Sequence, residues 1–397
     1  MKILWLPSWY PNPIEPVSGD FIQRHAEAVA ETVPIDVIHL LQSGANVFIE
    51  KEITIVNRKK NLTEYIHAFE FKPSGNKLLD VLRYNILYHR YFKKIVNEYF
   101  ASNGKPDLIH VHVPMKAGLA AIYILKKFNV PYIVSEQSSH YESSSPDYFF
   151  NRSRYYRYNT KRVFENAIAV TNVSSTIGKK LQSFFRIKNY YTIHNLVNTE
   201  FFNYKSKQRN DKIRFIHVSA MGEQKNPKGI IEALALLKQL NKNWECIFCG
   251  PYNNKLESIV KEKELEAYIH FTGEIKYEQV SDEMQSADAF ILFSNHENFP
   301  CVIIESLCCG LPVVTSNAGG ISEAINESNG IIVTVGNAKE LAEGLLGMII
   351  NSDKYDRKNI SEKAIALYNK KNIANQFLEL YKNIIDKGKI RDIDLIT

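Results

Sequence analysis

Short apolar runs alternate with amphipathic stretches along the whole chain, and this alternation constrains the fold more than any other feature. In the first half, runs rich in Ile and Val occur at 2–6, 35–40, 107–113, 131–135, 167–173 and 190–194. In the second half, they occur at 213–219, 244–250, 268–272, 288–293, 312–316 and 331–335. Amphipathic stretches such as 21–31, 78–100, 117–128 and 174–184 lie between them. Strands that alternate with helices form parallel sheets covered on both faces, so we predict an α/β protein with two such sheets.

A polar segment without apolar periodicity, residues 203–212, separates the two series of strands. Such segments are typical of linkers, and a chain of 397 residues is long enough for two or three domains. We therefore assign residues 1–200 to an N-terminal domain and residues 201–374 to a C-terminal domain. Residues 358–388 have the pattern of two further helices.

The composition, 45% apolar and 23% charged, is that of an ordinary soluble globular protein. No apolar run is long enough to span a bilayer, and Met1–Pro7 fits a first strand better than a signal peptide. These features predict a cytoplasmic location. The five cysteines include Cys246-x-x-Cys249, which lies within an apolar strand and has no second pair. We interpret this pair as part of the core rather than as a metal or redox site.

The net charge of +6 comes largely from the region between residues 116 and 188. Within it, the segment 152–162 carries five cations and three tyrosines in eleven residues. At helical spacing Arg154, Arg157 and Lys161 share one broad face, which predicts docking on the inner face of an anionic membrane. A solvated helix with packed tyrosines and a surface for a sugar acceptor remain alternatives. A nucleic-acid partner rests on charge alone, because no binding motif accompanies the basic residues.

The run from Ser294 to Glu305 joins an apolar strand to a short helix that ends at Gly310. Glu305 is the one acid of this helix, and its neighbours one turn away are small or apolar: Cys301, Val302, Cys308 and Cys309. A carboxylate on a packed face needs a partner such as a ligand hydroxyl. Glu297 lies in the loop at the carboxyl end of the strand, where ligands of open α/β sheets bind and where a helix N-terminus favours anions. Two acids beside such a helix predict a sugar nucleotide as the ligand.

The Glu-x7-Glu spacing is followed by Cys-Gly-Leu-Pro-Val-Val at 309–314 and by Gly-Gly-Ile-Ser-Glu at 319–323. With these motifs the chain resembles the retaining glycosyltransferases of family 4. The resemblance implies the GT-B fold, two Rossmann-like domains with a cleft between them, and a last helix, 375–397, that crosses back onto the N-terminal domain. It also implies transfer of a sugar from a nucleotide-diphosphate sugar to a glycan or lipid-linked acceptor with retention of configuration, in polysaccharide or glycolipid biosynthesis. No metal and no cofactor are expected. A sugar-nucleotide epimerase on the same fold, which converts the donor alone, is the competing enzyme.

The resemblance also assigns roles to individual residues. Glu297 holds hydroxyls of the donor sugar, Glu305 accepts hydrogen bonds from the ribose, and Lys225 neutralises the departing diphosphate. The backbone between them is expected to hold the sugar and phosphate, at Asn298, Phe299, Pro300, Cys301 and Val302. The family usually places an arginine five residues before the lysine, a position that Ala220 occupies here.

Three residues of the N-terminal half complete the predicted site. Gly19 opens the first helix after a Pro-rich loop, where the absence of a side chain allows close approach to a ligand. There is no Gly-x-Gly-x-x-Gly motif, which argues against a nicotinamide enzyme. His112 is expected to face the cleft and not a metal. Gln137 stands where the family often has histidine, and since an amide does not titrate, we expect no general base there.

Overall fold

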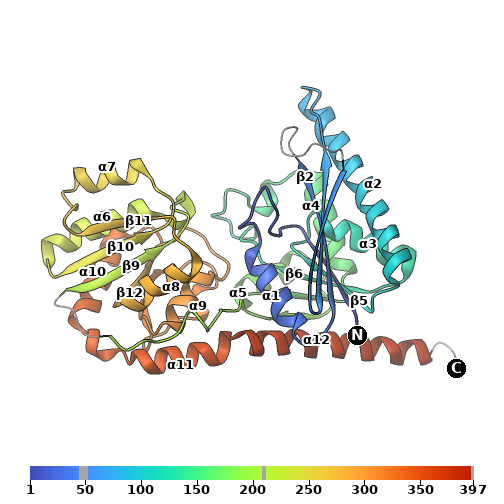
Figure 1. Ribbon diagram of the computed structural model, residues 1–397. Coiled ribbons are helices and arrows are strands. Elements are labelled where there is room, and N and C mark those ends of the chain that lie inside the picture. The colour runs from blue at the N-terminus through green and yellow to red at the C-terminus, as the bar shows by residue number, and fades with distance from the viewer. Residues whose placement is uncertain (44–51, 208–211, 395–397) are drawn as a thin grey trace.

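The computed structural model describes residues 1–43, 52–207 and 212–394, which form two lobes side by side (Figure 1). The first lobe contains an eight-stranded sheet in the order β3-β4-β2-β1-β5-β6-β7-β8, parallel except for the β3–β4 pair. Its strands are β1 (Ile3–Pro7), β2 (Ile35–Ser43), β3 (Glu52–Lys59), β4 (Leu62–Glu70), β5 (Leu108–His112), β6 (Tyr132–Glu136), β7 (Ala169–Asn172) and β8 (Tyr190–Thr192).

The second lobe contains a six-stranded parallel sheet in the order β11-β10-β9-β12-β13-β14. Its strands are β9 (Ile213–Val218), β10 (Trp244–Cys249), β11 (Ile269–Gly273), β12 (Ala289–Leu292), β13 (Val313–Ser316) and β14 (Gly330–Val333). All twelve predicted strands are therefore present, and the predicted α/β class with two Rossmann-like sheets is confirmed. Cys246 and Cys249 lie buried in β10, in agreement with their interpretation as core residues.

The β3–β4 hairpin was not predicted from the sequence. In β4, buried residues such as Leu62, Glu64 and Ile66 alternate with partly exposed ones. This alternation arises because the hairpin forms the edge of the sheet. Continuous apolar runs mark central parallel strands, and the alternating residues of an edge hairpin form no such run.

Helices cover the two faces of the first sheet because successive residues of its strands point to opposite sides. Leu4 and Leu6 of β1 belong to one cluster, together with residues of α2 (Lys77–Asn103), α3 (Ala117–Phe128), α4 (Arg154–Asn166) and α5 (Ser175–Phe184). Ile3 and Trp5 belong to the opposite cluster, with α1 (Asp20–Ala30) and α12 (Lys370–Asp394). The second lobe has one large core that includes α6 (Pro227–Leu240), α7 (Asn254–Glu262), α8 (Tyr277–Ser286), α9 (Cys301–Cys308), α10 (Ala338–Ile350) and α11 (Arg357–Tyr368).

Two chain segments connect the lobes. The first follows β8, and the second is the junction between α11 and α12, where Val197 N–H donates to the carbonyl of Tyr368 at 2.8 Å. From this junction α12 runs beneath the first lobe (Figure 1), and Ile373, Phe377 and Tyr381 pack into the cluster that contains α1. The α11–α12 pair was predicted from the sequence, although α12 already begins at Lys370.

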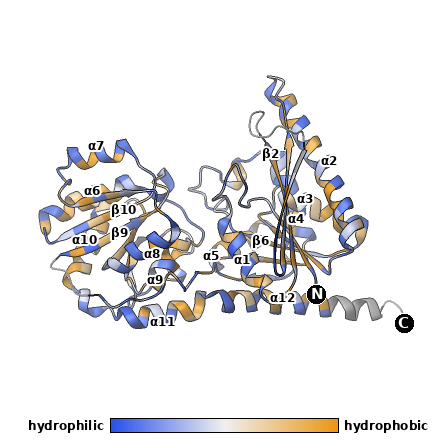
Figure 2. Ribbon diagram, viewed as in Figure 1, coloured by the Kyte–Doolittle hydropathy of each residue, from blue (hydrophilic) through white to orange (hydrophobic). Residues whose placement is uncertain are grey.

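Apolar and polar residues alternate around most helices, as expected for helices that pack on a sheet with one face (Figure 2). Within the described residues, none of the helices combines the length and the apolar composition that crossing a bilayer requires.

Candidate active site

The predicted catalytic pair meets where two neighbouring strands of the second sheet end. Lys225 closes a short turn, Glu223–Lys225, after β9, and Glu297 lies in the loop after β12. The Lys225 ammonium is 2.5 Å from Oε1 of Glu297, and the Glu297 side chain is almost completely buried. Gln224 ties the two loops together, because its backbone carbonyl accepts from Asn295 N–H at 2.8 Å and its side-chain amide donates to the carbonyl of His296 at 3.0 Å. These two hydrogen bonds hold together the loops that carry the ion pair.

Glu305 is buried in α9, as its apolar neighbours predicted. Its Oε1 accepts a hydrogen bond from the Tyr277 hydroxyl at 2.7 Å and lies 3.3 Å from Nη1 of Arg24. Burial raises the pKa of the Glu305 carboxyl above its ordinary value, and the two partners reduce that rise. Protein side chains thus supply part of the hydrogen bonding to Glu305 that the sequence analysis attributes to a ligand. Among the described residues, no hydrogen bond engages Oε2, so this oxygen can still accept from a ligand hydroxyl.

Arg24 is a site residue that the sequence did not single out. It lies on α1 in the first lobe and reaches Glu305 and Tyr277 in the second, with Nη1 2.5 Å from the Tyr277 hydroxyl. Its guanidinium also pairs with Asp20 at 3.2 Å and lies 5.1 Å from the centre of the Tyr277 ring. Arg24 and Glu305 are 281 positions apart, and local sequence patterns carry no information on such a contact.

The helix N-terminus beside Glu297 is anchored to the first lobe. The Asn298 side-chain amide donates to the carbonyl of Ser138 at 3.3 Å, and the Phe299 ring stacks on His194 with 4.5 Å between ring centres. The Asn195 side-chain amide donates to the carbonyl of Phe299 at 2.9 Å. Pro300 immediately precedes α9, which begins at Cys301, and both Cys301 and Val302 are partly exposed. These residues therefore lie at the junction of the lobes.

The Gly-Gly-Ile-Ser-Glu motif packs against the same loop. Gly319 has a φ of 59°, and a Cβ there would lie 2.0 Å from the carbonyl oxygen of Glu297. Gly320 N–H donates to the carbonyl of Asn298 at 2.8 Å. The Glu323 carboxylate accepts from the backbone N–H groups of Ser175 and Thr176 at 2.9 and 2.8 Å, so it caps α5 across the lobes. The motif positions Glu297 through backbone contacts that only glycine permits.

Gly19 precedes α1 with a φ of 68°, and a Cβ there would lie 2.6 Å from the carbonyl oxygen of Trp9. Glycine is therefore required by the path of the loop itself. Ala220 is exposed in the loop after β9, and the next cation along that loop is Lys225.

We expected His112 to face the cleft between the lobes, but its side chain is completely buried in the first lobe. Its ring is fully enclosed between the rings of Trp5 and His110, at 4.0 and 3.9 Å between centres. Burial, together with the neighbouring His110, holds the pKa of His112 well below its ordinary range. Gln137 is partly buried, and its Oε1 has no hydrogen-bond partner among the described residues.

Within the described ranges, no three side chains of His, Cys, Asp or Glu are grouped so that they could hold a metal ion.

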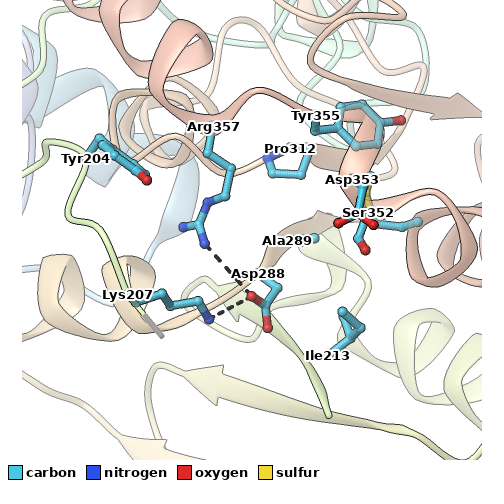
Figure 3. A pocket seen from close by; sticks show the side chains of 11 residues that line it. Tyr204, Lys207, Ile213, Asp288, Ala289, Pro312, Ser352, Asp353, Tyr355 and Arg357 are labelled. Carbon is cyan, nitrogen blue, oxygen red and sulfur yellow. Dashed lines mark ion pairs between the residues drawn. The ribbon is translucent and has the colours of Figure 1, made fainter. Parts of the chain in front are cut away.

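A separate cavity of about 280 Å³ opens at the other end of the second sheet (Figure 3). It is lined by Ile213, Asp288 and Pro312, which stand at the starts of β9, β12 and β13, whereas Lys225 and Glu297 follow strand ends. Its cations, Lys207 and Arg357, point toward Asp288, with separations of 2.7 and 3.8 Å. These pairs connect the linker and α11 to the sheet, and we assign the cavity no part in the candidate site.

Two family models match the chain in succession. The model described as Glycosyltransferase Family 4 matches residues 52–201, and the model described as Glycosyl transferases group 1 matches residues 198–366. The boundary between the two matches falls in the segment that connects the lobes.

Curated relatives align over most of the chain. A Bacillus subtilis protein provisionally assigned as the teichuronic acid biosynthesis glycosyltransferase TuaC is 22% identical and covers 87% of this chain and 88% of its own. An uncharacterized glycosyltransferase of Methanocaldococcus jannaschii is 25% identical over 78% of this chain and 85% of its own. Protein CapJ of Staphylococcus aureus is 27% identical over 74% of this chain and 77% of its own.

Solved structures share the fold. Sucrose-phosphate synthase from Thermosynechococcus elongatus superposes with a TM-score of 0.78 at 20% identity, over 98% of this chain and 100% of its own. Anabaena HepE, solved in complex with UDP, superposes with a TM-score of 0.72 at 19% identity, over 96% of this chain and 100% of its own.

Proposed function

Since the chain is a glycosyltransferase of the GT-B type, we propose that it transfers a sugar from a nucleotide-diphosphate sugar with retention of configuration. The observation that carries this proposal is the ion pair between Lys225 and the buried Glu297 beside the start of α9, with Glu305 one turn further along the same helix. The arrangement brings a cation, two carboxylates and a helix N-terminus together, which suits a diphosphate joined to two sugars. The complex of HepE with UDP supports a nucleotide ligand for this fold.

The two acids divide the donor between them in this proposal. Glu305 binds the ribose through Oε2, which no described residue occupies, and Glu297 binds hydroxyls of the transferred sugar. The backbone from Asn298 to Val302 lies between the two acids and binds the sugar and the phosphate. Gly19, at the start of α1, brings the backbone of the first lobe toward the diphosphate.

Breaking the bond between the sugar and the phosphate places negative charge on the diphosphate, and Lys225 stabilises this charge as it develops. Arg24 is a second cation beside Glu305, and in this proposal it compensates only in part for the arginine that Ala220 replaces. The acceptor hydroxyl attacks on the face from which the phosphate departs, and the leaving phosphate oxygen takes its proton. Configuration is then retained without a protein nucleophile, in contrast to glycosidases that use two carboxylates across one bond. No cofactor or metal ion takes part in this scheme.

The acceptor that we propose is a glycan or a lipid-linked glycan, in polysaccharide or glycolipid biosynthesis at the cytoplasmic face of a membrane. Support comes from the relatives, since one is assigned to teichuronic acid biosynthesis. Gln137 belongs to the acceptor side in this proposal, because its side chain retains an unpaired oxygen, whereas the buried His112 has no contact with the acceptor.

A thermal-shift screen with UDP-, GDP- and ADP-sugars tests the donor class, because a ligand that binds the native state raises its stability. The donor identified in this screen is then radiolabelled and incubated with the protein. The incubation is carried out with and without a lipid extract, and with and without EDTA. Transfer that needs the extract and survives EDTA supports the proposal. Conversion of the donor without an acceptor would instead identify an epimerase.

In the same assay, Glu297→Gln should reduce turnover much more than nucleotide affinity, because Glu297 is assigned to the sugar and not to the nucleotide. The matched control is Glu223→Gln, which removes an exposed acid from the neighbouring loop and should change neither quantity. An equal loss of nucleotide binding in Glu297→Gln would contradict the division of roles.

A further inference from the structure

The first turns of α2 expose an unusual number of aliphatic side chains. Leu78 is 84% exposed, and four further residues are more than half exposed: Leu79, Val81, Leu82 and Ile86. This part of α2 projects beyond the sheet of the first lobe (Figure 1). Water-exposed leucines in such a concentration are typical of a surface that is covered by a partner or a lipid phase.

The exposed face of α2 borders a groove of about 860 Å³. The opposite wall is the segment 152–156, where α4 begins, and Phe71 and Met115 contribute to its lining. The lining is mostly apolar, with Leu78, Val81 and Leu82 on one side and Tyr155 on the other. An apolar groove of this size fits a hydrocarbon chain.

The groove continues into a smaller and more polar cavity of about 320 Å³. The two share Gln42, Tyr84, Met115 and Lys116 as a common wall. The polar cavity is also lined by Ser8, Trp9 and Ser18, and thus extends to the loop that ends at Gly19. The two cavities together extend from the exposed face of α2 to the loop before Gly19.

Lys116 stands at the junction of the two cavities. Its ammonium lies 3.6 Å from the centre of the Tyr84 ring and 5.3 Å from that of Tyr88. Burial lowers the pKa of Lys116 to about 8, so the group is still largely protonated at neutral pH. None of the acids in the described ranges pairs with it. A partly buried ammonium without a counter-ion is a suitable place for an anionic group.

Cations also surround the outer end of the groove. Lys77 and Arg152 line it, Arg83 lies further along α2, and Arg154 opens α4. Asp80 is the one acid of the lining, and its carboxylate is held by the backbone N–H groups of Ser74 and Gly75 and by Arg83. The apolar face thus has a basic rim, which is complementary to lipids with anionic head groups.

We propose that the α2–α4 face docks on an anionic membrane surface and admits a membrane amphiphile to the active site. The hydrocarbon part of the amphiphile lies in the apolar groove, and its anionic group contacts Lys116 on the way to the loop before Gly19. This inference rests on the proposed function, and it specifies the acceptor as an anionic lipid-linked molecule. It also places the membrane contact on α2 as well as on the basic segment 152–162.

Sedimentation with vesicles tests the docking face. The wild type should bind vesicles of phosphatidylcholine mixed with phosphatidylglycerol more tightly than vesicles of phosphatidylcholine alone, and added salt should weaken this binding. The double variant Leu78→Asp/Leu82→Asp should lose about a hundredfold in partitioning, because two leucines leave the bilayer and two negative charges replace them. The matched control, Leu240→Asp/Ile350→Asp, changes two aliphatic residues of similar exposure in the second lobe and should bind like the wild type.

The role of Lys116 is tested with single-chain amphiphiles below their micelle concentrations. Lys116→Met should bind dodecyl phosphate roughly tenfold more weakly than the wild type, because a charge-assisted contact is lost. Binding of dodecyl maltoside, which has the same chain and no charge, should remain unchanged. Circular dichroism and thermal unfolding establish that each variant is folded.

Wild-type protein that stays in the supernatant with both kinds of vesicle would overturn the proposal. Equal binding by the leucine variant and the control would also overturn it, because the docking surface would then lie elsewhere. Binding of a protein partner to the α2–α4 face, without any binding of lipid, would overturn it as well. None of these measurements uses the donor. If the wild type binds no nucleotide sugar, the proposed function is refuted, and the vesicle experiment still gives its own independent result on the docking face.

Discussion

Replacing Glu305 with glutamine tests the ribose assignment with little change in side-chain shape. In the native structure Oε1 is engaged by Tyr277 and Arg24, and Oε2 has no hydrogen bond among the described residues. In the variant, an amide that carries no charge replaces the carboxylate that would accept from ribose hydroxyls. Hydrogen bonds to a charged group contribute about 1.5–3 kcal/mol each, and the amide oxygen can keep part of this. We therefore expect nucleotide binding to weaken by about 2–3 kcal/mol, which is roughly 30- to 150-fold in Kd.

The fold should tolerate the same substitution. Arg24 keeps its contact with Asp20 at 3.2 Å and its contact with the Tyr277 hydroxyl, so no buried cation is left without a partner. Burial also disfavours the ionised form of Glu305, and a neutral amide avoids that cost. We expect the free energy of unfolding to change by only about 1 kcal/mol.

Isothermal titration calorimetry with the nucleoside diphosphate measures affinity, and urea unfolding measures stability. Glu340→Gln is the matched control, because Glu340 accepts hydrogen bonds at the start of α10 and has no assigned ligand. Wild-type affinity in Glu305→Gln would refute the ribose assignment. A large loss of stability together with binding would show that Glu305 acts chiefly as a structural partner of Arg24.

Two further predictions concern charge and pH. Ala220→Arg should tighten nucleoside diphosphate binding by about 1–3 kcal/mol in calorimetry, because a bidentate contact with phosphate is added; unchanged affinity would mean that another cation, for which Arg24 is the candidate, already fills this place. Acid should destabilise the fold well above the range in which carboxylates titrate, because burial lowers the pKa values of His39 and His217 to about 4 and that of His25 to about 3. The unfolded chain binds protons below about pH 6.5 and these native histidines do not, so each lowers the free energy of unfolding by about 1.4 kcal/mol per pH unit as the pH falls from about 6.5 to 4. Urea unfolding followed by circular dichroism between about pH 7 and 5 measures this slope, and a constant free energy over that range would contradict it.

The sequence alone determined the architecture, because burial of a strand on both faces leaves a local record. Leu4 and Leu6 face one layer of helices, and Ile3 and Trp5 face the other. Because both faces of β1 are buried, its sequence is a continuous apolar run. The same local logic placed Glu305 in a buried position, since residues one turn away on a helix share its face. It also brought Lys225 and Glu297 to one edge of the sheet, because both follow the carboxyl ends of parallel strands.

Only the tertiary structure decided which groups from the other lobe approach the candidate site. The Arg24 side chain extends from α1 to Glu305 in the second lobe, and His112 is enclosed because Trp5 and His110 cover it. The joining of the apolar groove to the polar cavity likewise depends on how α2 lies beside the start of α4. Helical and strand periodicity arise from neighbours within a few residues, whereas these contacts join distant segments whose meeting depends on the packing of whole domains.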